Sequence, residues 1–238
     1  MLSSTLINIH ERTGISWTSL LIISTISLRT IVTLPLAIVQ RQRTRRLQNV
    51  MKIISVWEKT LKASLSNAPK EASLKIYSSK LSLKTRELYK LQSCHPLKTF
   101  LLPWIQIPLF ISVSLSIRNL AAYPSYSHTI APGFNTEGML WFTDLSVSDP
   151  FCVLPVVATS FYLLNLEIQT RKLPDSMRLR VVKFFMRLVS FSMVPIGVYS
   201  PSAVGLYWAC SAGFSVFQAL MFEVYEKRLV KKQLGTEI

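Results

Sequence analysis

Five stretches of predominantly apolar residues divide this chain. They cover approximately residues 17–39, 99–117, 151–168, 181–199 and 204–222. Each is long enough to cross a hydrocarbon core of about 30 Å as an α-helix, which rises about 1.5 Å per residue. The pattern therefore predicts an all-α membrane protein with five transmembrane helices.

The long segment between the first two spans, residues 40–98, has a different pattern. Apolar residues recur every three or four positions from Leu47 to Leu65 and again from Leu74 to Leu91. This spacing is typical of amphipathic helices. A turn between the two halves predicts an antiparallel helical hairpin.

The other segments outside the spans are shorter or less regular. Residues 1–15 form an N-terminal segment without the features of a cleaved targeting signal. The loop 119–150 is rich in Pro, Ser, Tyr and Gly and is predicted to be irregular. Residues 224–238 form a short basic tail.

The basic residues predict the orientation of the spans. The chain has 27 Lys and Arg against 12 Asp and Glu, a net charge of +15. Fourteen basic residues lie in 40–98, four in 169–180 and four in the tail, whereas the loop 119–150 holds none. Positively charged loops stay on the inner side of a membrane. The hairpin and the C-terminus are therefore predicted inside, and the N-terminus outside; nucleic-acid binding would not require this alternation.

The sequence shows no pattern of catalysis. The three cysteines, Cys94, Cys152 and Cys210, have no paired spacing, and the three histidines are scattered outside the spans. The motifs of zinc proteases, serine hydrolases and P-loop proteins do not occur. We therefore expect neither an enzyme nor a cofactor or metal site.

Arg29 is the main candidate for a functional residue. It lies near the middle of the first span, where a charged side chain costs about 2.5–3.5 kcal/mol on insertion scales. Glu167 and Glu223 lie near the inner ends of their spans, about 10 Å or more from Arg29 in depth. An ion pair with either remains an alternative, but the pattern favours a hydrated groove lined by protein.

Every other span also carries polar residues that could line such a groove. Each one alone is more typical of hydrogen bonding between helices, and it is their occurrence in every span that indicates a polar interior. The predicted groove residues beside Arg29 are Thr25, Thr33, Gln106, Asn165, Ser211 and Gln218, with Ser24, Thr30, Ser190, Ser192 and Ser215 as further polar positions.

The start of the predicted hairpin is strongly basic. It could recruit a substrate, contact anionic lipid headgroups or bind ribosomal RNA, or it could be a solvated surface. The predicted recruitment residues are Arg41, Arg43, Arg45, Arg46 and Lys52.

Several motifs occur in the order in which the YidC/Oxa membrane insertases carry them. They are Arg29 with Leu34-Pro35-Leu36, His95-Pro96 with Pro103-Trp104-Ile105-Gln106-Ile107-Pro108, Trp141-Phe142-Thr143-Asp144-Leu145 with Asp149-Pro150, and Pro201-Ser202-Ala203-Val204-Gly205-Leu206-Tyr207-Trp208. The chain resembles that superfamily over about residues 16–230. One difference is that Arg29 precedes Pro35 by six residues, where bacterial members more often have five.

Within the superfamily, the chain is most similar to the mitochondrial branch that assists cytochrome c oxidase assembly. The resemblance implies an insertase core, residues 16–223, in the mitochondrial inner membrane. Its N-terminus would lie in the intermembrane space, and its hairpin and C-terminus in the matrix. The groove would be open to the matrix and the lipid.

The resemblance also implies partners. These are membrane lipid, newly made cytochrome c oxidase subunit II, whose C-terminal tail would be exported, and other oxidase assembly factors. The tail after the fifth span is short, so strong ribosome binding is not expected. Two alternatives stay open: a small anion or metabolite transporter that uses Arg29, and an assembly scaffold that inserts nothing.

The charge pattern makes a topology prediction at Cys94, which lies at the end of the hairpin segment. A variant with Cys152→Ser and Cys210→Ala keeps Cys94 as its only thiol. A membrane-impermeant maleimide should label Cys94 only after the inner membrane of mitoplasts is permeabilised. Labelling of intact mitoplasts would show that the predicted orientation is wrong.

Overall fold

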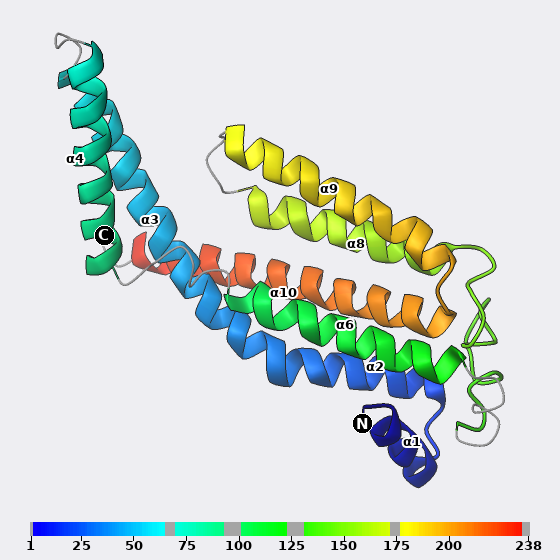
Figure 1. The fold of residues 1–238 in the computed structure, drawn as a ribbon. Helices are drawn as coiled ribbons and strands as arrows, with labels where there is room; N and C mark the ends of the chain where they lie inside the picture. Colours follow the sequence, from blue (N-terminus) through cyan, green and yellow to red (C-terminus); the bar gives the residue numbers. More distant parts are fainter. Residues whose placement is uncertain (1, 65–69, 93–100, 123–130, 172–176, 235–238) are drawn as a thin grey trace. The chain divides into compact units, whose positions relative to one another are not determined.

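The computed structural model describes residues 2–64, 70–92, 101–122, 131–171 and 177–234, and the regular elements of these segments are helices (Figure 1). The chain forms two compact units. One consists of residues 1–32 and 109–238, and the other of residues 33–108.

The first unit is a helical bundle built on the last helix. Its elements are α1 (Leu2–Thr13), α2 (Trp17–Leu28), most of the π-helix η1 (Arg29–Thr33), the later part of α6 (Leu101–Ala122), α8 (Val153–Thr170), α9 (Met177–Val198) and α10 (Ser202–Leu234). Helix α10 packs against α8 and α2, and α8 also packs against α9. The core includes Trp17, Leu21, Ile117 and Ala158, all at most 2% exposed.

Aromatic rings join α6 to α10. The Phe110 ring stacks on Tyr207 and Trp208 with centroid distances of 5.6 and 5.9 Å. The indole Nε1 of Trp208 donates to Ser114 Oγ at 3.0 Å. Helices α2 and α10, which pack against each other, run alongside one another in Figure 1.

The second unit contains α3 (Leu34–Ser64) and α4 (Lys70–Leu91), which pack together. The Lys62 ammonium lies 5.7 Å from the Tyr77 ring centroid, and that of Lys84 lies 5.8 Å from the Trp57 centroid. Each contact joins a residue of α3 to one of α4. The turn between these helices lies outside the described residues, so the matrix hairpin stays a prediction.

The all-helical expectation is confirmed, and four candidate membrane spans are found among the described residues. They are Trp17–Ser64, Trp104–Ala122, Arg180–Val198 and Ser202–Arg228. Helix α8, which occupies the third predicted span, is not among them. Asn165, Glu167 and Gln169 make its last turns polar. The count of five spans therefore stays a prediction.

The helices extend beyond the apolar segments. Helix α3 continues from the first span to Ser64, α6 reaches Ala122, and α10 runs through most of the basic tail to Leu234. The sequence did not predict α1. Hydrophobicity marks the stretch that suits lipid, whereas backbone hydrogen bonding can continue into polar sequence.

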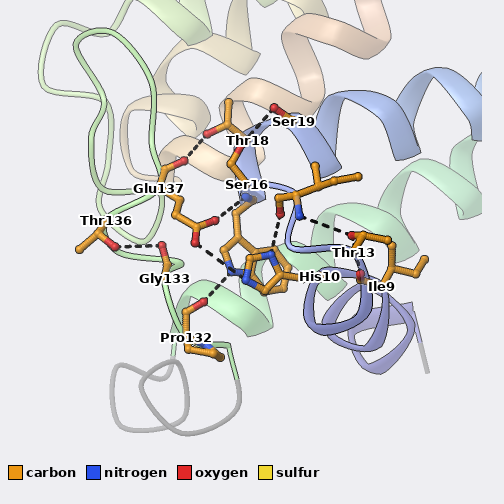
Figure 2. A network of polar contacts seen from close by, with 12 residues as sticks. Ile9, His10, Thr13, Ser16, Thr18, Ser19, Pro132, Gly133, Thr136 and Glu137 are labelled. Atoms are coloured by element: carbon orange, nitrogen blue, oxygen red, sulfur yellow. Dashed lines mark hydrogen bonds and ion pairs between the residues drawn. The ribbon is translucent and has the colours of Figure 1, made fainter.

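The described part of the outer loop, residues 131–152, caps the first turn of α2. The Trp17 backbone N–H donates to Glu137 Oε2 at 2.7 Å, and the Thr18 hydroxyl donates to the Glu137 carbonyl at 2.5 Å. The Trp17 indole donates to the Pro132 carbonyl at 2.9 Å, and His10 stacks on that indole with centroids 4.4 Å apart. Figure 2 shows these groups converging. A carboxylate here also suits the positive end of the helix dipole.

The same loop caps α8 through Asp149, which is 4% exposed. Its Oδ2 accepts from the Leu154 N–H at 2.7 Å. Its Oδ1 accepts from the Phe151 N–H and from the Trp141 indole, each at 3.1 Å. One buried carboxylate thus satisfies three donors at the start of the helix.

Backbone carbonyls of the loop cap α10. The Val147 carbonyl accepts from the Ser202 N–H at 2.7 Å and from its hydroxyl at 2.8 Å. The Leu145 carbonyl accepts from the Ala203 N–H at 3.1 Å. The first N–H groups of α10, which have no partner inside the helix, are thereby paired.

A tight turn shapes this loop at Gly138. The Gly138 N–H donates to the Thr143 carbonyl at 2.9 Å, and Met139 and Phe142 exchange backbone hydrogen bonds within the turn. A Cβ on Gly138 would lie 1.9 Å from the Phe142 carbonyl oxygen. Only glycine fits this approach of two backbone segments.

We predict that Asp149→Asn destabilises the protein by about 1.5–3 kcal/mol. The amide removes the negative charge and one acceptor oxygen, so at least one buried donor loses a charge-assisted partner. Thermal unfolding of the detergent-purified protein measures the effect. Asp144→Asn is the control, because that half-buried carboxylate bonds only locally, to Ser146. Equal changes in melting temperature for the two variants would contradict a special role for Asp149.

Candidate polar site around Arg29

Arg29 stands where the first long helix changes its hydrogen bonding. It follows α2 directly and begins the π-helix η1, and its side chain is buried, with the residue 7% exposed. Pro35 has no N–H to donate to the carbonyl four residues earlier, so regular α-helical bonding is interrupted here. A wider π turn next to such an interruption is often found at functional sites.

Two serines of α10 accept hydrogen bonds from the guanidinium of Arg29. The Nε of Arg29 donates to Ser211 Oγ at 3.0 Å, and Nη2 donates to the same oxygen. The Nη1 group donates to Ser215 Oγ at 3.0 Å. The serines are four residues apart and therefore lie on one face of the helix. Ser211 is fully buried.

Helix α8 also approaches α10 closely at Gly213. A Cβ on Gly213 would lie 3.3 Å from the Phe161 ring, which would have to give by a few tenths of an ångström. Gly213 is two residues from Ser211 and from Ser215, so it faces another side of α10 than they do.

Helix α8 carries two further shielded hydroxyls. Thr159 is 4% exposed, and neither its Oγ1 nor the phenolic oxygen of Tyr162 has a hydrogen-bond partner among the described residues. We define the Arg29 site as Arg29, Ser211 and Ser215, which the hydrogen bonds join.

The carboxylates that the sequence offered as partners of Arg29 contact other cations. Glu167 pairs with Arg187, and its Oε2 lies 3.9 Å from the Lys183 ammonium. Glu223 lies 3.3 Å from Lys227, one turn further along α10. Glu167 and Glu223 therefore each have a cation partner other than Arg29.

Several predicted groove residues bond within their own helices. The Thr25 hydroxyl is buried and donates to the Leu21 carbonyl at 2.6 Å, and Asn165 accepts from Gln169 at 3.0 Å. The hydroxyls of four further candidates also donate to carbonyls of their own helices, namely Ser24, Thr30, Ser190 and Ser192.

Among the groove residues predicted from the sequence, the structure brings Ser211 into direct contact with Arg29. Thr33 is buried at the end of η1, and Gln218 is half-buried on α10. Gln106 is half-buried on α6, in the second unit. A groove that includes these residues stays a prediction.

The predicted recruitment residues all lie on α3. Arg46 and Lys52 are exposed, and Arg41, Arg43 and Arg45 are half-buried. Their contact with a substrate, with lipid or with RNA stays a prediction.

Sequence reasoning missed the shielded hydroxyls of Thr159 and Tyr162 and named Ser215 only as a further polar position. The spacing of Thr159 and Tyr162 was a usable signal, because residues three apart share a helix face. Two polar residues on one face of an otherwise apolar helix indicate a polar position in the bundle, as a single charged residue does.

Comparison with known proteins explains the motifs that surround this site. Residues 8–229 match the family described as "60Kd inner membrane protein", which is the YidC/Oxa1 family. The chain belongs to this family. Its members are membrane insertases and not enzymes.

Relatives include mitochondrial proteins with two kinds of name. The human "Cytochrome c oxidase assembly protein COX18, mitochondrial" is 32% identical over 225 residues, which is 91% of this chain and 68% of that protein. The Schizosaccharomyces pombe protein of the same name is 31% identical, over 90% of this chain and 95% of its own length. The bovine "Mitochondrial inner membrane protein OXA1L" is 28% identical, over 94% of this chain and 48% of that protein. By this likeness the insertase is a multi-pass protein of the mitochondrial inner membrane.

We predict that Ser211→Ala destabilises this insertase more than Ser215→Ala. Two N–H groups of Arg29 donate to Ser211 and one donates to Ser215, and each lost hydrogen bond to a buried charge costs about 1.5–3 kcal/mol. Thermal unfolding in detergent provides the measurement. Ser190→Ala is the control, because Ser190 is half-buried on α9 and its hydroxyl donates to the Met186 carbonyl of its own helix. A Ser211→Ala protein as stable as this control would show that the serine hydroxyl does not support the guanidinium.

Proposed function

We propose that this protein exports the C-terminal tail of cytochrome c oxidase subunit II across the mitochondrial inner membrane. The family match supports insertion as the activity. The relatives named as cytochrome c oxidase assembly proteins support the link to the oxidase. Subunit II itself is proposed from the resemblance to the branch that serves it.

The single observation that carries the mechanism is the buried cation in an apolar bundle. Arg29 is 7% exposed, and its guanidinium donates to the hydroxyls of Ser211 and Ser215. Hydroxyls solvate the charge without cancelling it, so it can still attract a passing carboxylate. A polar path beside Arg29 would lower the cost of moving a hydrophilic tail through the membrane.

The proposed orientation follows from the charges and from the caps. Helices α2, α8 and α10 all begin at the segment 131–152, which holds acidic residues and no Lys or Arg. That end would face the intermembrane space. The basic residues of α3 would meet the substrate at the matrix surface and deliver its tail to the Arg29 site.

Variants of Arg29 test whether the charge serves export. Arg29→Lys should keep much of the activity, because a point charge can attract a carboxylate without the guanidinium geometry. Arg29→Glu should reduce export of an acidic tail about tenfold or more, through like-charge repulsion. Arg29→Ala should impair acidic tails more than neutral ones. Protease protection of reporter tails with graded negative charge measures export, and the steady-state level of each variant provides the control.

The same experiment separates the alternatives. An abundant Arg29→Ala variant that exports every tail as well as the natural protein would remove the charge from the mechanism. Normal subunit II topology in cells depleted of the protein would favour an assembly scaffold. Solute flux through liposomes that contain the pure protein would favour a transporter.

A further inference from the structure

Among the described residues, two cations of α9 share one carboxylate of α8. The Nε of Arg187 donates to Glu167 Oε1 at 3.2 Å, and its Nη2 donates to the same oxygen. The Lys183 ammonium lies 3.9 Å from Glu167 Oε2. We call Glu167, Lys183 and Arg187 the α8–α9 cluster. Two positive charges and one negative charge leave it with a formal charge of +1.

The cluster lies near one end of a membrane span. Lys183 and Arg187 come shortly after Arg180, where the candidate span Arg180–Val198 begins. At a rise of 1.5 Å per residue, they are about 6 and 10 Å along that helix. Glu167 belongs to the last turn of α8, which ends at Thr170. Basic side chains at this depth can extend toward the lipid headgroups.

The cluster faces the outside of the bundle and not its core. The side chains of Glu167 and Arg187 are 47% and 51% exposed. Helix α9 packs against α8, and the two run side by side in Figure 1. Phe184 and Leu188, each next to a cation of the cluster, are 70% and 58% exposed. Exposed apolar side chains of a membrane span face lipid, so lipid surrounds these charges.

An exposed stripe of α8 leads to the cluster. Val156, Ser160 and Leu164 are exposed and follow one another at intervals of four residues, and Glu167 comes three residues after Leu164. Residues at these intervals share one face of a helix. The face is largely apolar until it reaches the charged cluster. It therefore offers an acyl chain a surface that ends at two cations.

We propose that the α8–α9 cluster binds the phosphodiester group of an anionic phospholipid, with an acyl chain along the exposed face of α8. A net charge next to hydrocarbon is costly, and a phosphodiester carries one negative charge. One such group therefore brings the cluster to neutrality. The site would bind lipid whether or not the protein exports a tail.

The hydrogen-bonding capacity of the cluster also suits a phosphate. A guanidinium has five N–H donors and an ammonium has three, whereas a carboxylate offers about four acceptor positions. Glu167 therefore cannot satisfy both cations of α9. Phosphate oxygens supply further acceptors, and the planar fork of Arg187 matches their geometry. Glu167 would hold the two cations in place for the headgroup.

The charge of the cluster selects between classes of phospholipid. A zwitterionic headgroup brings its own cation beside the phosphate, so the site would keep its charge of +1. An anionic headgroup such as phosphoglycerol brings no cation. Under the proposed orientation, this end of α9 lies in the matrix leaflet.

Native mass spectrometry of the full-length protein in detergent tests the site. The ligands are phosphatidylglycerol, phosphatidylcholine and glycerophosphoglycerol, the last being the anionic headgroup without acyl chains. Arg187→Gln makes the cluster neutral, whereas Glu167→Gln raises its charge to +2. Both variants break the same ion pair, so each controls for the structural loss in the other. Arg118→Gln is a further control, because it removes one exposed cation from α6.

We expect Arg187→Gln to weaken binding of phosphatidylglycerol about fivefold or more. Glu167→Gln should bind this lipid at least as tightly as the natural protein does, and Arg118→Gln should match the natural protein. Phosphatidylcholine and glycerophosphoglycerol should bind the natural protein more weakly. A phosphatidylglycerol with a photoreactive acyl chain should crosslink to α8 or α9.

Several results would overturn the proposal. Unchanged binding by Arg187→Gln, or the same loss for Arg187→Gln and Glu167→Gln, would mean that the cluster is a structural ion pair only. Equal binding of phosphatidylcholine would refute the selection of anionic lipid. Equal binding of glycerophosphoglycerol, or crosslinks confined to other helices, would refute a lipid site on α8 and α9. Each of these results leaves the export of a tail unaffected.

Discussion

The backbone N–H groups at the start of α2, α8 and α10 impose the constraint on which the bundle depends. The first four N–H groups of a helix have no partner within it, and leaving them unsatisfied near a membrane is costly. In α2 these N–H groups donate to Glu137, in α8 to Asp149, and in α10 to the carbonyls of Leu145 and Val147. Three helices far apart in the sequence are thereby tied to one short segment, which fixes where each begins. Acidic and carbonyl oxygens also suit the positive ends of three helix dipoles.

The position at which each helix begins also determines the depth of every residue along that helix. Arg29 comes twelve residues after the capped Trp17, and Ser211 comes nine residues after the capped Ser202. Because both helices begin at the same segment, the two residues lie at similar depths, and the long arginine side chain spans the remaining difference. The π-helix that begins at Arg29 adjusts the first helix further, because one such turn holds an additional residue.

The sequence predicted those features that depend on composition and left open those that depend on packing. The length of the apolar segments predicted the all-helical class, and Arg29 was identified from the free-energy cost of placing a charge in a membrane span. Ser211 was one of many polar residues in the spans, and periodicity could not show that it, rather than Thr25 or Asn165, would meet Arg29. That choice depends on the rotation of each helix, which the caps and close contacts such as Gly213 with Phe161 determine. Helix ends were missed for a related reason, since α3 and α10 continue into polar sequence.

Under the proposed function, the serine hydroxyls that contact Arg29 would ease the release of an exported tail. A buried ion pair is costly to separate, because each partner is then left as an uncompensated charge. Hydrogen bonds from a guanidinium to neutral hydroxyls are weaker than those to a carboxylate. A carboxylate of the tail would therefore displace Ser211 and Ser215, and the serines would bind the guanidinium again once the tail leaves. The charge remains solvated at both stages, so the barrier to exchange stays low. Site chemistry of this kind suits brief, repeated contacts with a moving chain better than tight binding of a small ligand.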